Sequence, residues 1–317
     1  MDRTIISLLI YVLWYRLMYT LIIISLIFFG LVFGSFGSVI FYRLWDWPTK
    51  ETWKWFLVWR SECPKCHHQL KARNLVPIFS WLFQWWKCEY CKTPISRFYP
   101  FLEITSVIIF LSVFFILSKH WIPGHNIGLW EWYIYAIFMM ISAWLLWIIF
   151  LYDIKTYELH ITATVFLAII TLFFTLFFWT NKLQILLWIW IFTLIFLLIY
   201  YISKVYVKQK YKKDVEWFWL WDVIIAPILW AWLVFFLQPT WIFQWSYLVC
   251  LFIILSSLVG LLYFWIELLI KHFLIKTKKK SKKPYWLKNS IPFLPSMIIW
   301  CFLEILLRNS IIGMIYF

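Results

Sequence analysis

The sequence predicts an all-α polytopic membrane protein with about eight transmembrane helices and a cytoplasmic zinc-binding loop that carries four cysteines. Three observations support this fold class: long apolar runs, an uneven distribution of basic residues, and two Cys-x-x-Cys pairs. Of the 317 residues, 65% are hydrophobic and 14% are charged. A soluble domain has about 45–50% apolar and about 25% charged residues. The composition therefore excludes a soluble globular enzyme, a disordered protein and a secreted disulfide scaffold.

Apolar runs indicate the individual spans, because about 18 or more consecutive apolar residues can cross the hydrocarbon core of a membrane. The stretch before residue 17 is also apolar, and we interpret it as an extension of the first span. The chain then divides into an N-terminal transmembrane segment (1–42), a zinc-ribbon-like loop (43–98) and a seven-helix membrane core (99–317). The predicted spans are 17–41, 99–118, 131–151, 161–179, 184–203, 223–238, 247–270 and 291–308.

Basic residues gather in every second loop between these spans. The 43–98 loop holds ten lysines and arginines, the 204–216 loop holds five, and 271–288 contains a lysine-rich run. Of the intervening loops, 119–130 holds one lysine and 239–246 holds neither lysine nor arginine. The positive-inside rule places the basic loops in the cytoplasm and both termini outside. We therefore interpret the net charge of +15 as a topology signal and an attraction for anionic membrane lipid, with no role in binding nucleic acid.

Four cysteines form two Cys-x-x-Cys pairs in the long polar loop. Cys63 and Cys66 are separated by 21 residues from Cys88 and Cys91. Each two-residue spacer lets a tight turn present both sulfurs to one ion, and four thiolates are a typical ligand set for structural zinc. Because the loop is too short and polar to build its own core, metal binding would supply its folding free energy. A redox dithiol is the alternative, although it would not need two pairs.

Two aspartates lie at predicted span ends on the cytoplasmic side. Asp153 follows the third span and Asp222 precedes the sixth. Acidic residues at such positions are costly and are usually functional. A pair that shares one proton could supply a base that activates water and an acid that protonates a leaving amine. Alternatively, each aspartate caps a helix or pairs with a lysine such as Lys155, and Glu103 and Glu267 are further intramembrane acids.

These features together resemble the type IV prepilin peptidases, a family of bifunctional leader peptidase/N-methyltransferases. The four cysteines and the two aspartates match the pattern of that family. Glu103, which follows the second cysteine pair, also matches this pattern. The other matching segments are GSFGSV at 34–39, NLVPIFSWL at 74–82, PISRFYP at 94–100 and IPFLP at 291–295.

The resemblance implies an aspartic endopeptidase of the bacterial inner membrane whose active site faces the cytoplasm. Asp153 and Asp222 would be the catalytic residues that cleave the leader from prepilin-like or pseudopilin substrates, and 99–317 would be the peptidase core. S-adenosylmethionine would then methylate the new N-terminus, although the sequence shows no glycine-rich fingerprint that would assign residues to it. The alternatives are a catalytically impaired homologue acting as a membrane scaffold, and an ion-coupled transporter that uses the aspartates as cation sites.

Tryptophan and glycine occur in an unusual ratio, 27 to 7. Glycine averages about 7% of residues, or roughly 22 in a chain of this length. Interfacial aromatic belts account for some tryptophans, but not for Trp85-Trp86 in a polar loop, where a turn glycine is expected. The resembled family has Gly-x-Gly-Asp where residues 219–222 read Trp-Leu-Trp-Asp. We hypothesise that UGA codons, which the source reads as glycine, were translated as tryptophan. The rival explanation is a degenerate homologue, in which two indoles block close helix approach.

The coding sequence and the native protein test this hypothesis. We expect UGA at codons 219 and 221, and peptide mass spectrometry of the native protein should show the fixed mass loss of glycine in place of tryptophan. UGG at these codons, or tryptophan at both positions in active native enzyme, would contradict the hypothesis.

Overall fold

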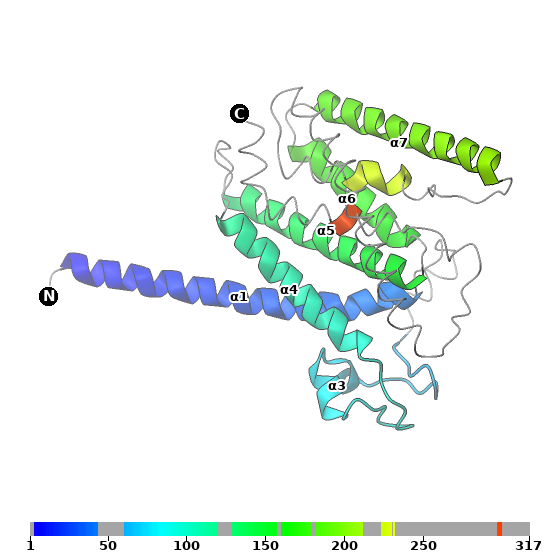
Figure 1. Cartoon of the computed structure of the whole chain (residues 1–317). Coiled ribbons are helices and arrows are strands. Elements are labelled where there is room, and N and C mark those ends of the chain that lie inside the picture. The colour runs from blue at the N-terminus through cyan, green and yellow to red at the C-terminus, as the bar shows by residue number, and fades with distance from the viewer. Residues whose placement is uncertain are drawn as a thin grey trace, which may run out of the picture. The chain divides into compact units, whose positions relative to one another are not determined.

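The structure, a computed structural model, is helical apart from the cysteine loop throughout the residues that it describes (Figure 1). The described residues are 3–43, 60–119, 129–156, 160–178, 182–211, 223–229, 231 and 297–299. The predicted all-α class is confirmed for this part of the chain. Its helices are α1 (Arg3–Arg43), η1 (Ala72–Leu75), α3 (Phe79–Phe83), α4 (Phe98–Lys119), α5 (Leu129–Thr156), α6 (Ile161–Phe178) and α7 (Lys182–Tyr211).

Three helical segments within the described residues are long and apolar enough to cross a membrane. They are Ile10–Tyr42 in α1, Phe98–Ser118 in α4 and Trp130–Thr156 in α5. Helices α6 and α7 contain shorter apolar segments, Ile161–Phe177 and Leu186–Ile202. These five helices lie where the first five spans were predicted. The apolar stretch before residue 17 is also part of the single helix α1, as expected.

The last three predicted spans fall largely outside the described residues. Residues 223–229 and 231 are helical, in agreement with the start of the sixth predicted span, and 297–299 are helical within the eighth. The seventh, 247–270, lies wholly outside the described residues. A total of eight spans and the cytoplasmic location of the basic loops therefore stay predictions.

The chain divides into two compact units, Met1–Ile148 and Ile149–Phe317, whose boundary falls inside α5. The first unit contains α1, the cysteine loop, α4 and most of α5. The second contains the C-terminal end of α5, followed by α6 and α7, which contact each other.

In the first unit, the close approach of α1 and α4 depends on two glycines one helical turn apart. A Cβ atom added to Gly30 would lie 2.7 Å from the Cα of Val107, and one added to Gly34 would overlap the Cα of Glu103. Because both obstacles are backbone atoms, no side-chain rearrangement could make room. Small residues at such crossings let helices pack closely in lipid. This packing matters there because apolar side chains gain little free energy by moving from lipid into a helix interface. The Gly-x-x-x-Gly spacing therefore fixes where α1 crosses α4.

Helix α5 packs on this pair through large aromatic side chains. A Cβ at Gly37 of α1 would lie 3.3 Å from the Trp144 ring, so the indole lies directly against the glycine. The ring of Phe33 meets Trp144 edge-on, with 5.1 Å between centroids. Trp147 donates an indole hydrogen bond of 3.0 Å to the hydroxyl of Thr105 in α4. The first unit therefore has a three-helix core that presents its α1 and α4 ends to the cysteine loop.

Candidate metal centre and carboxylate site

The cysteine loop contains two tight turns with the same backbone pattern. In each, the N–H four residues after the first cysteine donates to the carbonyl of that cysteine, at 2.9 Å from His67 to Cys63 and 3.0 Å from Lys92 to Cys88. His67 and Lys92 have φ angles of 54° and 58°, in the left-handed region. An antiparallel β-bridge flanks each turn, Glu62 with Gln69 and Lys87 with Pro94. The two Cys-x-x-Cys pairs are therefore two copies of one local structure.

These turns bring the four cysteine sulfurs into one cluster. All four lie within 4.8 Å of one another, and the Sγ atoms of Cys63 and Cys91 are 3.8 Å apart. Four sulfurs at about 2.3 Å from a tetrahedral zinc ion are about 3.8 Å from each other. All four cysteines are free of disulfides, with Cys63 and Cys88 buried and Cys66 and Cys91 more exposed. The predicted clustering is confirmed, and its dimensions fit a zinc ion.

The thiols of this cluster differ in acidity. Hydrogen bonds from the hydroxyl and the backbone N–H of Thr93 lower the pKa of Cys91 to about 6. The backbone N–H of His68 favours the Cys66 thiolate, but burial and the sulfurs of Cys63 and Cys91 outweigh it and raise the pKa of Cys66 to about 11. A bound cation would relieve this crowding of negative charge, because metal binding requires all ligands as thiolates.

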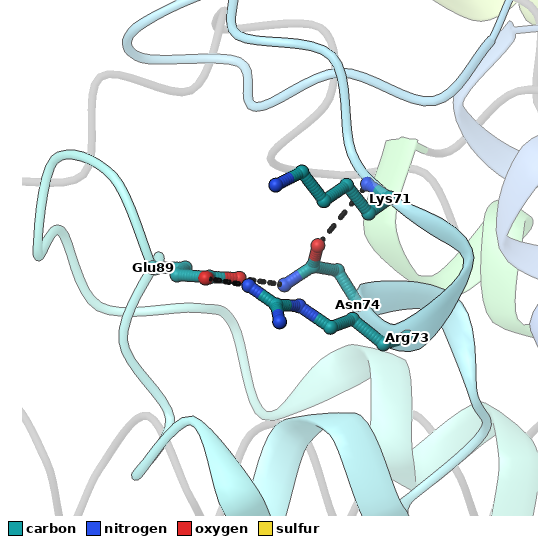
Figure 2. A network of polar contacts seen from close by, with 4 residues as sticks. All are labelled: Lys71, Arg73, Asn74 and Glu89. Atoms are coloured by element: carbon teal, nitrogen blue, oxygen red, sulfur yellow. Dashed lines mark hydrogen bonds and ion pairs between the residues drawn. The ribbon is translucent and has the colours of Figure 1, made fainter.

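A polar network joins the second cysteine turn to η1 (Figure 2). Glu89 accepts a hydrogen bond of 2.7 Å from the Nδ2 of Asn74 and a second one from the guanidinium of Arg73. The Oδ1 of Asn74 accepts the backbone N–H of Lys71 at 3.1 Å. The amide of Asn74, and then the Arg73 guanidinium, hold the pKa of Glu89 below its usual value. The segment between the cysteine pairs is thereby attached to the turn that carries Cys88 and Cys91.

Glu103 attaches the cysteine loop to the membrane helices. Its side chain is buried in α4, and its Oε2 accepts the backbone N–H of Ile78 at 2.6 Å. Ser35 of α1 donates a hydrogen bond to the same carboxyl. Ile78 is the N-cap of α3 and has a φ of 60°, which is rare for a β-branched residue. Sequence reasoning treated Glu103 only as a further acid and part of a motif; its place one turn inside a span was the available signal.

The predicted catalytic aspartates are described only in part. Asp153 lies in the last turn of α5 in the second unit and is 7% exposed. Its neighbour Tyr152 meets the ring of His160 edge-on at 4.8 Å, and the buried His160 caps the start of α6 through Nδ1. Asp222 lies outside the described residues, immediately before the helical segment 223–229. Whether the two carboxylates meet therefore stays a prediction.

Trp85 and Trp86 occupy backbone positions that favour glycine. Their φ angles are 51° and 49°, and their side chains are exposed. The N–H of Trp86 donates to the carbonyl of Trp81 at 2.9 Å, and that of Trp85 to Leu82 at 3.0 Å. These are the two hydrogen bonds of a Schellman motif that ends α3, in which the residue at the Trp85 position is usually glycine. The backbone thus supports the tryptophan-for-glycine hypothesis here, while positions 219 and 221 lie outside the described residues.

The Bacterial Peptidase A24 N-terminal domain matches residues 28–117. These residues comprise the C-terminal part of α1, the cysteine loop and nearly all of α4, so they include both the cluster of four cysteines and the Glu103 contact. Residues 28–117 are therefore similar to this domain. The predicted resemblance is confirmed for this part of the chain.

Curated relatives of this chain are prepilin leader peptidase/N-methyltransferases. That of Aeromonas hydrophila is 30% identical over 119 residues, which are 31% of this chain and 40% of the relative. That of Vibrio cholerae is 33% identical over 109 residues, which are 33% of this chain and 41% of the relative. That of Pectobacterium carotovorum is 27% identical over 165 residues, which are 46% of this chain and 53% of the relative. The chain thus matches between 40% and 53% of the length of these three proteins. No solved structure matches the chain.

Replacing both Trp85 and Trp86 by glycine should stabilise the cysteine loop by about 2 kcal/mol or more, because each side chain costs about 1–2 kcal/mol at positive φ. Hydrogen exchange of the loop amides in the full-length protein measures the effect. Trp81→Gly is the matched control, since a glycine inside α3 should destabilise the loop by about 1 kcal/mol. Faster exchange in the double glycine variant would show that both indoles stabilise the turn.

Metal analysis of the purified protein should find about one zinc per chain. Replacing any of Cys63, Cys66, Cys88 or Cys91 by serine should release the metal and make residues 60–95 sensitive to protease. His67→Ser is the control, because it changes an exposed side chain in the same turn and leaves all four thiols in place. A loop that stays protected without metal would show that its order has another source.

Proposed function

We propose that this protein is an intramembrane aspartic endopeptidase that removes the leader peptide of type IV prepilin-like proteins on the cytoplasmic side of the bacterial inner membrane. The observation that carries the proposal is the similarity of residues 28–117 to the peptidase A24 N-terminal domain, together with the similarity of this chain to prepilin leader peptidase/N-methyltransferases. The burial of Asp153 near the end of an apolar helix supports it, because an acid in this environment is costly and usually functional.

In the proposed mechanism, Asp153 and Asp222 share one proton, because two adjacent carboxylates cannot both ionise easily. The ionised carboxylate removes a proton from water as the oxygen attacks the scissile carbonyl carbon, and the protonated carboxyl donates to the carbonyl oxygen. Collapse of the tetrahedral intermediate breaks the C–N bond, with a proton passing to the leaving amine. The products are a leader with a free carboxyl and a mature chain with a free amino terminus.

We assign N-methylation of this new terminus to the same protein, with S-adenosylmethionine as the methyl donor, because its relatives are named for both activities. Cys63, Cys66, Cys88 and Cys91 would hold zinc. Such an ion supplies structure alone, since four thiolates leave no open coordination position. The loop would then be a rigid cytoplasmic platform, and residues 99–317 would form the peptidase core.

The substrate is proposed to lie with its apolar stem in the bilayer and its basic leader in the cytoplasm. A leader with positive charge is held on that side by the same rule that orients the basic loops of the enzyme. A carboxylate pair at the cytoplasmic ends of two spans would therefore meet the bond between the leader and the stem.

Asp153→Asn and Asp222→Asn should each abolish leader cleavage while the protein still inserts into the membrane, because one carboxylate cannot supply both base and acid. The assay uses purified protein with glycine at every UGA codon, a prepilin substrate in the same vesicles, and mass spectrometry of the products. Glu131→Gln is the matched control, since Glu131 lies in the first turn of the helix that carries Asp153 near its end.

Substantial cleavage by either aspartate variant would reject the carboxylate pair. A wild-type protein that binds prepilin without cleaving it would favour the scaffold alternative. Ion flux that depends on both aspartates, in the absence of cleavage, would favour the transporter.

A further inference from the structure

The cysteine loop exposes an apolar patch around α3. Its five side chains are each between 42% and 78% exposed, and the rings of Phe79 and Phe83 stack with their centroids 6.4 Å apart. The patch excludes Trp85 and Trp86, so it does not depend on whether these residues are glycines. Contiguous exposed apolar side chains usually mark an interaction site. The apolar patch comprises Leu75, Val76, Phe79, Leu82 and Phe83.

The contact with Glu103 sets the position of this patch along the membrane helices. Glu103 is the sixth residue of α4, so it lies about 7–8 Å along the helix from Phe98 at 1.5 Å per residue. Its carboxyl holds the N–H of Ile78, the residue that begins α3. The segment Phe98–Ser118 is long and apolar enough to cross a membrane. The start of α3 is therefore held close to the N-terminal end of this span by Glu103, and α3 lies next to that end of α4 in Figure 1.

The charge of the loop complements an anionic lipid surface. Residues 60–97 contain seven lysines and arginines but only two glutamates. Both glutamates already contact cationic or polar side chains, Glu62 with His67 and Glu89 with Arg73 and Asn74. Apolar side chains beside a surplus of lysine and arginine are typical of segments that lie in the membrane interface, where the apolar face enters the boundary between headgroups and acyl chains.

We propose that the apolar patch inserts into the lipid interface of the leaflet next to the cysteine loop. Glu103 acts as the positioning residue that holds the start of α3 near the end of α4, and basic side chains of the loop bind lipid phosphates. The metal cluster would then be held at the membrane surface by lipid as well as by protein. This inference rests on the membrane-spanning character of α4 and not on the proposed peptidase activity.

Photo-crosslinking of the full-length protein in vesicles of phosphatidylcholine and phosphatidylglycerol tests the proposal. Phe83→p-benzoylphenylalanine places the probe at the most exposed residue of the patch and keeps an aromatic ring there. Illumination followed by mass spectrometry should reveal a phospholipid adduct, and the same replacement at Leu82 should give one too. His67→p-benzoylphenylalanine is the matched control, because His67 is an exposed polar residue of the same loop; its adduct yield should be several-fold lower.

Any one of three results would overturn the proposal. The first is the absence of a lipid adduct at both patch positions, provided that residues 60–95 keep their protease protection in detergent and the loop is therefore folded. The second is an equal yield at His67, which would mean non-specific contact with lipid. The third is an adduct to a second copy of the chain, or to added prepilin, in place of lipid. Lower yields at both patch positions in vesicles without phosphatidylglycerol would support the role assigned to the basic residues.

Discussion

The hydrogen bond between the buried carboxyl of Glu103 and the backbone N–H of Ile78 is the contact on which the first unit depends. Glu103 lies where Gly34 allows the backbones of α1 and α4 to touch, and Ser35 donates to the same carboxyl. Without this acceptor, a backbone N–H would lack its partner at the edge of the membrane, where an unsatisfied polar group is costly. One side chain thus couples the packing of two helices to the placement of α3.

The cysteine loop is ordered by several such tethers because it has too few residues for a hydrophobic core. The sulfur cluster closes the two turns on each other, and Glu89 ties η1 to the second turn through Asn74 and Arg73. Glu103 then holds the start of α3. The apolar side chains that a larger domain would bury are left exposed on α3. A loop built in this way needs a surface for those side chains, and the adjacent bilayer is one.

Local features of this chain could be predicted from its sequence, and contacts between distant residues could not. The first five long helices and the cysteine cluster follow from hydropathy and from a two-residue spacing, both of which act within a few residues. Helix α7 extends to Tyr211, well past the predicted end at residue 203, because hydropathy marks the apolar length and not the basic turns that continue the helix. The Glu103–Ile78 contact joins residues 25 positions apart, and no periodicity encodes it. A contact between Asp153 and Asp222 would be a tertiary property of the same kind, and it stays a prediction.

The backbone of the cysteine loop bears on the interpretation of residues 219–222, although the two segments are far apart in the chain. The tryptophan-for-glycine hypothesis arose from composition and from residues 219–222, where the resembled family has Gly-x-Gly-Asp. At Trp85 glycine is favoured for a different reason. The two hydrogen bonds that end α3 require a positive φ angle at residue 85, whatever its side chain. A degenerate homologue would be expected to lose glycines where catalysis needs them, but it has no reason to place tryptophans at a helix terminus that still adopts the glycine conformation. One change in codon reading would account for both positions. It would also give residues 219 and 221 the small side chains that the proposed approach of Asp222 to Asp153 needs.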